Sequence, residues 1–164
     1  GLHFGLAYDD IQNGFQLFEP AGMRMEIVTI NHCILINDAY NANPDSMEAA
    51  LRFLGTYPAS RRIAVLGNMY ELGEYAEQCH RGLAEHWLNA KIDYLITVGE
   101  LASWAGQEAI RRNVSAERVL MAADIREAAD YLKKVASTGD VILLKGSRAM
   151  AMENMIKLLE EGEN

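Results

Sequence analysis

Short apolar runs alternate with longer amphipathic stretches along this chain. The runs at 62–66 and 94–98 are nearly continuous in hydrophobic residues, which is typical of strands buried on both faces of a parallel sheet. The intervening stretches repeat apolar residues every three or four positions, as amphipathic helices do. The expected strands are 25–30, 33–37, 62–66, 94–98, 118–121 and 141–144. The expected helices are 8–17, 44–54, 74–89, 101–112, 125–136 and 149–160.

Only two residues, Asn31 and His32, separate the first two strands, and this spacing predicts an antiparallel hairpin. The later strands alternate with helices, which predicts parallel pairing with helices on both faces. We therefore expect an α/β fold, a single Rossmann-like domain. Its sheet should have about six strands, mostly parallel, with one antiparallel strand from the N-terminal hairpin. Ligands of such sheets bind outside the carboxyl ends of the strands.

The composition is that of an acidic globular domain, since half of the 164 residues are hydrophobic and the formal net charge is -8. This balance argues against a nucleic-acid partner, because phosphates attract a basic face, but it is compatible with a small anionic ligand. No apolar run approaches the ~20 residues of a membrane span, and no signal peptide is visible. The first residue is Gly1 rather than Met, which fits a piece of a longer protein.

The cysteines predict neither a disulfide framework nor a metal site. There are only two, Cys33 and Cys79, which favours a reducing compartment and hence a cytoplasmic location. Cys79 and His80, taken with His86, lack the paired spacing of zinc ligands. We therefore expect no bound metal in this chain.

Polar residues follow three of the expected strands, and the first such segment is 37–46. Asn43 suits the N-cap of the next helix and Pro44 its first position, so Asn43 is either a helix cap or a ligand contact. Helix capping leaves Asp38 unexplained. An acidic residue at a strand end accepts hydrogen bonds from ribose hydroxyls in nucleotide-binding folds. Asp38 is therefore a candidate nucleotide contact.

The second and third segments, 67–73 and 145–148, carry charged residues. Glu71 precedes a helix and is either a ligand contact or a solvated loop acid. Ser147 suits an N-cap of the last helix, but Lys145 and Arg148 would then flank a helix N-terminus, where the macrodipole disfavours cations. Two cations at that place favour a site for an anion or carboxylate.

Several common catalytic motifs are absent from the sequence. It contains no Gly-x-x-x-x-Gly-Lys-Ser/Thr phosphate loop and no Gly-x-Gly-x-x-Gly dinucleotide motif. No serine or cysteine has an evident histidine partner for nucleophilic catalysis. The chain therefore holds at most part of a nucleotide site.

The polar segments together resemble one family, the Mur ligases of the D-Ala-D-Ala-adding type. The resemblance lies in DAYNANPDSM at 38–47, VLGNMYELG at 65–73 and KGSRAM at 145–150, in that order. Residues 23–26 are similar to the family's Gly-Arg-x-Glu stretch, and His80 stands where the family often has a histidine. The resemblance runs from about Asp9 to the end of the chain.

Two positions depart from the family pattern. Met23 stands where a glycine is common, and Asn68 stands where an aspartate is common. The second departure weakens any catalytic role for position 68.

The resemblance implies the C-terminal domain of a three-domain enzyme. An N-terminal domain would hold the UDP-sugar, a central domain would hold ATP and Mg2+ on its phosphate loop, and this domain would close over ATP and receive D-Ala-D-Ala. The peptide carboxylate of UDP-N-acetylmuramoyl-tripeptide would be phosphorylated and then attacked by the dipeptide amine. Residues 1–20 would be the tail of the central domain and the hinge, and residues 21–164 the C-terminal domain.

By this similarity, four residues would contact ATP: Arg24, Asp38, Asn41 and Asn43. Four would contact the incoming substrate: Lys145, Ser147, Arg148 and Glu71. The isolated chain would be inactive, because the other two domains hold most of the catalytic machinery. Two alternatives are a freestanding α/β nucleotide-binding enzyme and a non-catalytic interaction module.

Overall fold

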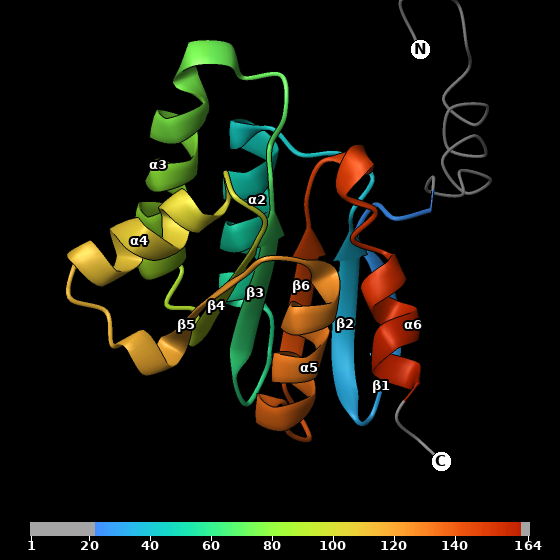
Figure 1. Ribbon diagram of the computed structural model, residues 1–164. Helices are drawn as coiled ribbons and strands as arrows, with labels where there is room; N and C mark the ends of the chain where they lie inside the picture. The colour runs from blue at the N-terminus through green and yellow to red at the C-terminus, as the bar shows by residue number, and fades with distance from the viewer. Residues whose placement is uncertain (1–21, 162–164) are drawn as a thin grey trace, which may run out of the picture.

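The computed structural model describes residues 22–161 and contains one six-stranded sheet (Figure 1). The strands are β1 (Glu26–Ile30), β2 (Cys33–Asp38), β3 (Arg62–Gly67), β4 (Tyr94–Val98), β5 (Val119–Ala122) and β6 (Val141–Lys145). The α-helices are α2 (Pro44–Thr56), α3 (Ala76–Asn89), α4 (Ser103–Arg111), α5 (Ile125–Val135) and α6 (Asn154–Glu160). Short 3-10 turns are η2 (Gly73–Tyr75), η3 (Ala116–Arg118) and η4 (Arg148–Met150). The helix predicted at 8–17 lies outside the described residues.

The strand order is β1-β2-β6-β3-β4-β5. Only the β1–β2 pair is antiparallel, with Glu26 opposite Asn37, and every other pair is parallel. The predicted hairpin and mostly parallel sheet are therefore confirmed. Because β6 is inserted between β2 and β3, the carboxyl ends of these three strands lie side by side. This is the switch point of strand order, where α/β sheets bind ligands.

Helices cover both faces of the sheet, and successive residues of a central strand face opposite layers. In β3, Ala64 and Leu66 pack in one core with α2, α3 and α4. Ile63 and Val65 pack in the other core with α5 and α6. Figure 1 shows α5 and α6 in front of the sheet and α2 behind it. Two-sided burial explains why the sequence of β3 is continuously apolar.

The last predicted helix, 149–160, is wrong in its first part. The chain makes the 3-10 turn η4, then passes through a left-handed residue, Ala151, with φ of 47°, and α6 begins only at Asn154. The interruption places the fully buried Met152 against Gly67 and Gly146 at the ends of β3 and β6. Burial of Met152 thus outweighs the local preference for one continuous helix.

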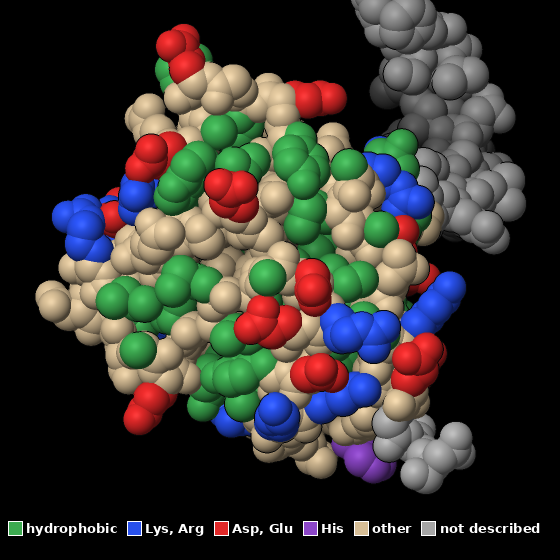
Figure 2. Space-filling model, in the orientation of Figure 1, with side chains coloured by type: hydrophobic (Ala, Val, Ile, Leu, Met, Phe, Trp, Pro, Cys, Tyr) green, Lys and Arg blue, Asp and Glu red, His purple; other side chains and the backbone are tan. Residues whose placement is uncertain are grey.

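Within the described residues, no helix is long and apolar enough to cross a membrane. On the face shown in Figure 2, acidic and basic side chains are interspersed and no large basic patch is formed.

Candidate functional site

Two adjoining pockets open at the carboxyl edge of the sheet, where the loops after β2, β3 and β6 meet. The smaller, the Asp38 pocket, has a volume of about 260 Å3 and is lined by Arg24, Asp38, Tyr40, Asn41, Asn43, Ser46 and Lys145. The larger, the Arg148 pocket, has a volume of about 810 Å3, and its lining includes Tyr40, Asn41, Asn43, Tyr70, Glu71, Ser147 and Arg148. The shared residues form the boundary between the pockets.

The residues singled out in the sequence divide between these pockets. The four predicted nucleotide contacts all line the Asp38 pocket. Three of the four predicted substrate contacts line the Arg148 pocket, and they are Glu71, Ser147 and Arg148. The fourth, Lys145, lines the Asp38 pocket instead.

Asp38 is the last residue of β2, and two groups hold its carboxylate. Lys145 Nζ donates to Asp38 Oδ2 at 2.6 Å, and the Met25 amide donates to Oδ1 at 3.3 Å. A carboxylate has about four acceptor positions, so two remain for a ligand. Hydroxyl groups of a ribose are donors of the right kind for them.

Arg24 and Tyr40 form the outer wall of the Asp38 pocket. The Arg24 guanidinium carbon lies 4.2 Å from the Tyr40 ring centroid, a cation–π contact that holds both side chains. Within residues 22–161, Arg24 has no carboxylate within 4.0 Å. No carboxylate of the described residues therefore neutralises its charge, although the domain as a whole is acidic.

Asn43 caps α2, as one of its two interpretations predicted. Its side chain accepts from the Ser46 amide at 2.8 Å, and the Asn43 amide donates to Ser46 Oγ at 3.1 Å, which completes a capping box. The cap occupies the side-chain oxygen only. The side-chain amide nitrogen is left for a ligand of either pocket.

Two glycines allow the loops after β3 and β6 to meet. A Cβ on Gly146 would lie 3.2 Å from Gly67 Cα, closer than ordinary van der Waals contact. This approach lets the Ser147 amide donate to Asn68 O at 2.9 Å, and the Tyr70 amide donate to Ser147 Oγ at 3.0 Å. Ser147 therefore binds the neighbouring loop and does not cap a helix with its side chain. Its hydroxyl hydrogen has no acceptor among the described residues, so it is free to donate to a ligand.

His80 fixes the middle of the 67–73 loop from α3. It is fully buried, its Nε2 accepts from the Met69 amide at 2.9 Å, and its Nδ1 lies 2.6 Å from Ala76 O. These partners require a proton on Nδ1 and none on Nε2. Burial lowers the pKa of His80, partly offset by its hydrogen bond to Ala76 O, so the ring is neutral near pH 7. The sequence singled out His80 only through the family resemblance.

Asn68 also has a structural role, because its side chain connects its own loop to the segment that leads into α4. Its Oδ1 accepts from the Ala102 amide at 2.8 Å and its Nδ2 donates to the Tyr70 hydroxyl at 3.1 Å. The side chain is almost fully buried. An ionised aspartate could replace the first contact but has no proton for the second. Asparagine makes both contacts as they stand.

Arg148 lies in η4 rather than at the N-terminus of α6, so the helix-dipole argument for an anion site there is wrong. Its Nη1 binds Glu153 and lies 3.2 Å from Met23 Sδ. Its Nε and Nη2 groups have no partner among residues 22–161. Glu71, in a left-handed conformation with φ of 65°, lines the same pocket and has no ion pair in this part of the chain. The pocket thus offers a guanidinium edge and a carboxylate.

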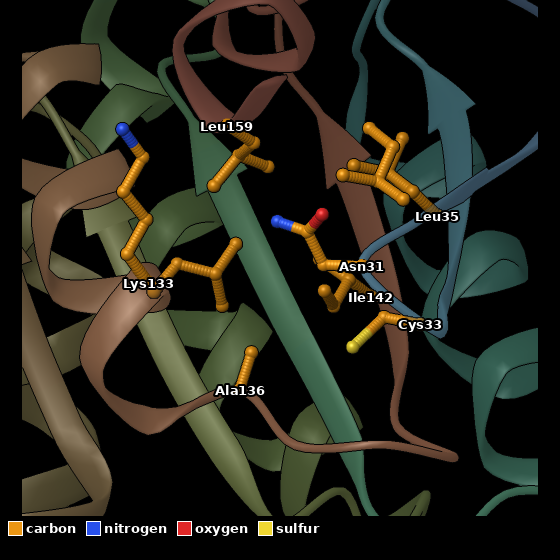
Figure 3. A pocket seen from close by; sticks show the side chains of 9 residues that line it. Asn31, Cys33, Leu35, Lys133, Ala136, Ile142 and Leu159 are labelled. Carbon is orange, nitrogen blue, oxygen red and sulfur yellow. The ribbon is translucent and has the colours of Figure 1, made fainter. Parts of the chain in front are cut away.

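A third pocket, about 240 Å3 in volume, lies at the amino end of the sheet between the hairpin, α5 and α6 (Figure 3). Its lining is mainly aliphatic, with Leu35, Ile142 and Leu159 around the hollow. Cys33 is buried there and donates to Ser137 O at 3.2 Å. Charged groups do not converge in it, which distinguishes it from the two pockets at the carboxyl edge.

Fold and pockets together define an α/β domain with two adjoining pockets, lined in part by charged residues, at the carboxyl edge of a mostly parallel sheet. Residues 23–148 match the family model described as "Mur ligase, glutamate ligase domain". The chain belongs to the Mur ligase family, as the motifs in its sequence predicted.

Relatives of one type match almost the whole chain. UDP-N-acetylmuramoyl-tripeptide--D-alanyl-D-alanine ligase of Bacillus subtilis (strain 168) is 34% identical over 163 residues, which are 98% of this chain and 35% of that protein. The ligase of the same name from Escherichia coli (strain K12) is 31% identical over 98% of this chain and 34% of its own length. The chain therefore spans about a third of the length of these curated relatives.

Solved structures of MurF enzymes share the fold. A crystal structure of MurF from Acinetobacter baumannii superimposes with a TM-score of 0.83 at 28% identity, over 97% of this chain and 35% of that one. MurF ligase from Thermotoga maritima, in complex with ADP, gives a TM-score of 0.72 at 26% identity, over 88% of this chain and 32% of that one. The expected α/β architecture is confirmed by both comparisons.

Proposed function

We propose that this chain is the C-terminal domain of an ATP-dependent ligase that adds D-Ala-D-Ala to UDP-N-acetylmuramoyl-tripeptide in cytoplasmic peptidoglycan synthesis. Residues 21–164 would form the domain, and residues 1–20 would be the tail of the central domain and the hinge. The relatives with that name support the reaction. The observation that carries the proposal is the pair of adjoining pockets, one suited to a nucleotide and the other to a zwitterion.

The Asp38 pocket fits the ribose end of ATP. Asp38 offers two free acceptor positions for hydroxyl groups, and Arg24 offers a cation to the phosphates. ATP supplies the phosphoryl group that activates the peptide carboxylate. By the family resemblance, Mg2+ would be bound mainly by the central domain.

The Arg148 pocket fits a dipeptide with an amine at one end and a carboxylate at the other. The free edge of Arg148 can bind a carboxylate through two parallel hydrogen bonds, and the Ser147 hydroxyl can add a third. Glu71 can accept from the amine. Holding both ends orients the amine for attack on the activated carboxylate, and positioning of this kind supplies much of the catalysis in such reactions.

The closing motion of the domain would couple nucleotide binding to catalysis. The loops of both pockets lie on one edge of the sheet, so a single rigid movement brings ATP contacts and dipeptide contacts to the central domain together. Such closure assembles the site only around bound substrates and excludes water from the reaction.

The test compares the chain alone with the longer protein that contains it. With ATP, Mg2+, UDP-N-acetylmuramoyl-tripeptide and D-Ala-D-Ala, the longer protein should form ADP only when all substrates are present. The chain alone should release no phosphate. Turnover by the purified chain alone would favour the freestanding enzyme, and a longer protein without dipeptide-dependent ADP formation would favour the interaction module.

A further inference from the structure

Lys145 is the last residue of β6 and one of the few charged side chains in the protein interior, with 2% of its surface exposed. A buried ammonium is costly unless nearby groups replace the water that it loses. The partners of Lys145 therefore indicate what the residue does.

The Lys145 ammonium contacts oxygens of Asp38, the last residue of β2, and of Asn41 in the segment that follows. Nζ lies 2.6 Å from Asp38 Oδ2, 3.0 Å from Asn41 O and 3.5 Å from Asp38 O. A lysine has three N–H donors and no acceptor. Two donors are thus directed to Asp38 Oδ2 and Asn41 O, and the third has only the longer contact with Asp38 O inside this buried setting.

The sheet itself places these groups together. Asp38 and Lys145 are partners in the parallel β2–β6 pair, so their side chains leave neighbouring strands at the same level. The ammonium then crosses the strand ends to reach Asn41 O. Lys145 thereby determines which acceptor positions of Asp38 face the Asp38 pocket. Its contact with Asn41 O also holds this residue, which lines both pockets, against the end of β6.

We propose that Lys145 is a positioning residue for the nucleotide, acting through Asp38, and is not a ligand of the dipeptide. This inference rests on the proposed ligase function. It reassigns Lys145 from the group of substrate contacts, where the family resemblance had placed it.

The test is steady-state kinetics of Lys145→Met in the full-length ligase, with ATP and D-Ala-D-Ala varied in turn. Loss of a charge-assisted hydrogen bond should raise the KM for ATP about tenfold or more, while the KM for D-Ala-D-Ala stays within about twofold. Lys133→Met, at an exposed lysine of α5, is the matched control and should change neither value. A raised KM for the dipeptide with an unchanged KM for ATP would overturn the assignment.

A double variant, with Lys145→Met added to Asp38→Asn, separates positioning through Asp38 from direct contact between Lys145 and the nucleotide. If Lys145 acts through Asp38, adding Lys145→Met to Asp38→Asn should change the KM for ATP by less than about twofold, because effects within one unit are not additive. A further tenfold loss in that background would mean that Lys145 meets the nucleotide itself, and the proposal would be wrong.

The contact is also measurable in the unaltered 164-residue chain, which keeps the proposal testable if Lys145→Met does not fold. With 15N-labelled lysine, the Lys145 ammonium should give slowly exchanging N–H signals, unlike exposed Lys133. Exchange as fast as that of Lys133 would refute the geometry. Failure of the full-length protein to use D-Ala-D-Ala would instead refute the proposed function and leave this measurement unaffected.

Discussion

Replacing Arg148 by lysine keeps the positive charge of the side chain but removes the planar geometry of the guanidinium. Among residues 22–161, Arg148 makes its contacts through Nη1 alone, in the ion pair with Glu153 and the contact with Met23 Sδ. Under the proposed function, the edge formed by Nε and Nη2 would bind the dipeptide carboxylate through two parallel hydrogen bonds. A lysine offers a single charged group there and cannot reproduce the planar pair.

Arg148→Lys should have a large effect on catalysis and a small effect on stability. Hydrogen bonds to charged groups contribute about 1.5–3 kcal/mol, so Arg148→Lys in the ligase should lower kcat/KM for D-Ala-D-Ala about ten- to a hundredfold. The Arg148 side chain is 55% exposed, and exposed ion pairs such as that with Glu153 contribute only about 0–1 kcal/mol to stability. The variant should therefore fold almost as stably as the wild type.

The assay follows ADP formation with the dipeptide varied at saturating ATP, beside thermal unfolding of the same samples. Arg52→Lys is the matched control, since Arg52 is also exposed and forms an ion pair with Glu48 on α2. It should leave both measurements unchanged. The reasoning fails if Arg148→Ala keeps kcat/KM for the dipeptide within about twofold of wild type, a difference under ~0.5 kcal/mol.

Two further predictions concern His80 and Gly146, which hold the loops around the two pockets in place. Burial keeps His80 neutral and lowers its pKa below the ordinary 6.5. The unfolded chain therefore takes up a proton first, and the free energy of unfolding in urea should fall below pH 6.5, by at most about 1.4 kcal/mol per pH unit from this residue. The dependence should weaken in His80→Gln, and an identical pH profile would contradict it. Gly146→Ala should cost about 1–3 kcal/mol, because its Cβ would press on Gly67 Cα. Gly82→Ala in α3 meets nothing within 4 Å and should be neutral or stabilising in the same denaturation series.

Much of the fold could be predicted because its signals are local. The two-residue gap at Asn31 predicted the hairpin, and continuous apolar runs predicted the buried parallel strands, whose packing on both faces leaves no room for alternation. The cap at Asn43 could also be predicted from the sequence, since its partner Ser46 is three residues away. The proposed nucleotide pocket was suggested by Asp38 at a strand end, a position whose neighbours are fixed by the sheet.

The last helix shows where local signals are insufficient. Residues 149–160 have helical periodicity, and the sequence carries no glycine or proline to interrupt it. The interruption at Ala151 comes instead from Met152, which packs against the ends of β3 and β6. Those strands belong to other parts of the sequence, so the competing burial is invisible until the sheet is assembled.

Ser147 and Lys145 extend the same argument to the site. Ser147 has the chemistry of a cap, as Asn43 has, but its oxygen accepts from the Tyr70 amide, 77 residues away in the sequence. Lys145 beside Arg148 has the appearance of a second cation for a ligand, but its partner Asp38 is 107 residues away. A hydrogen-bonding side chain takes whichever partner burial brings to it, because leaving a buried polar group unpaired costs about 1–3 kcal/mol. At the edge of a parallel sheet those partners come from neighbouring strands, so strand order, rather than neighbouring sequence, determines which polar residues remain free to bind a ligand.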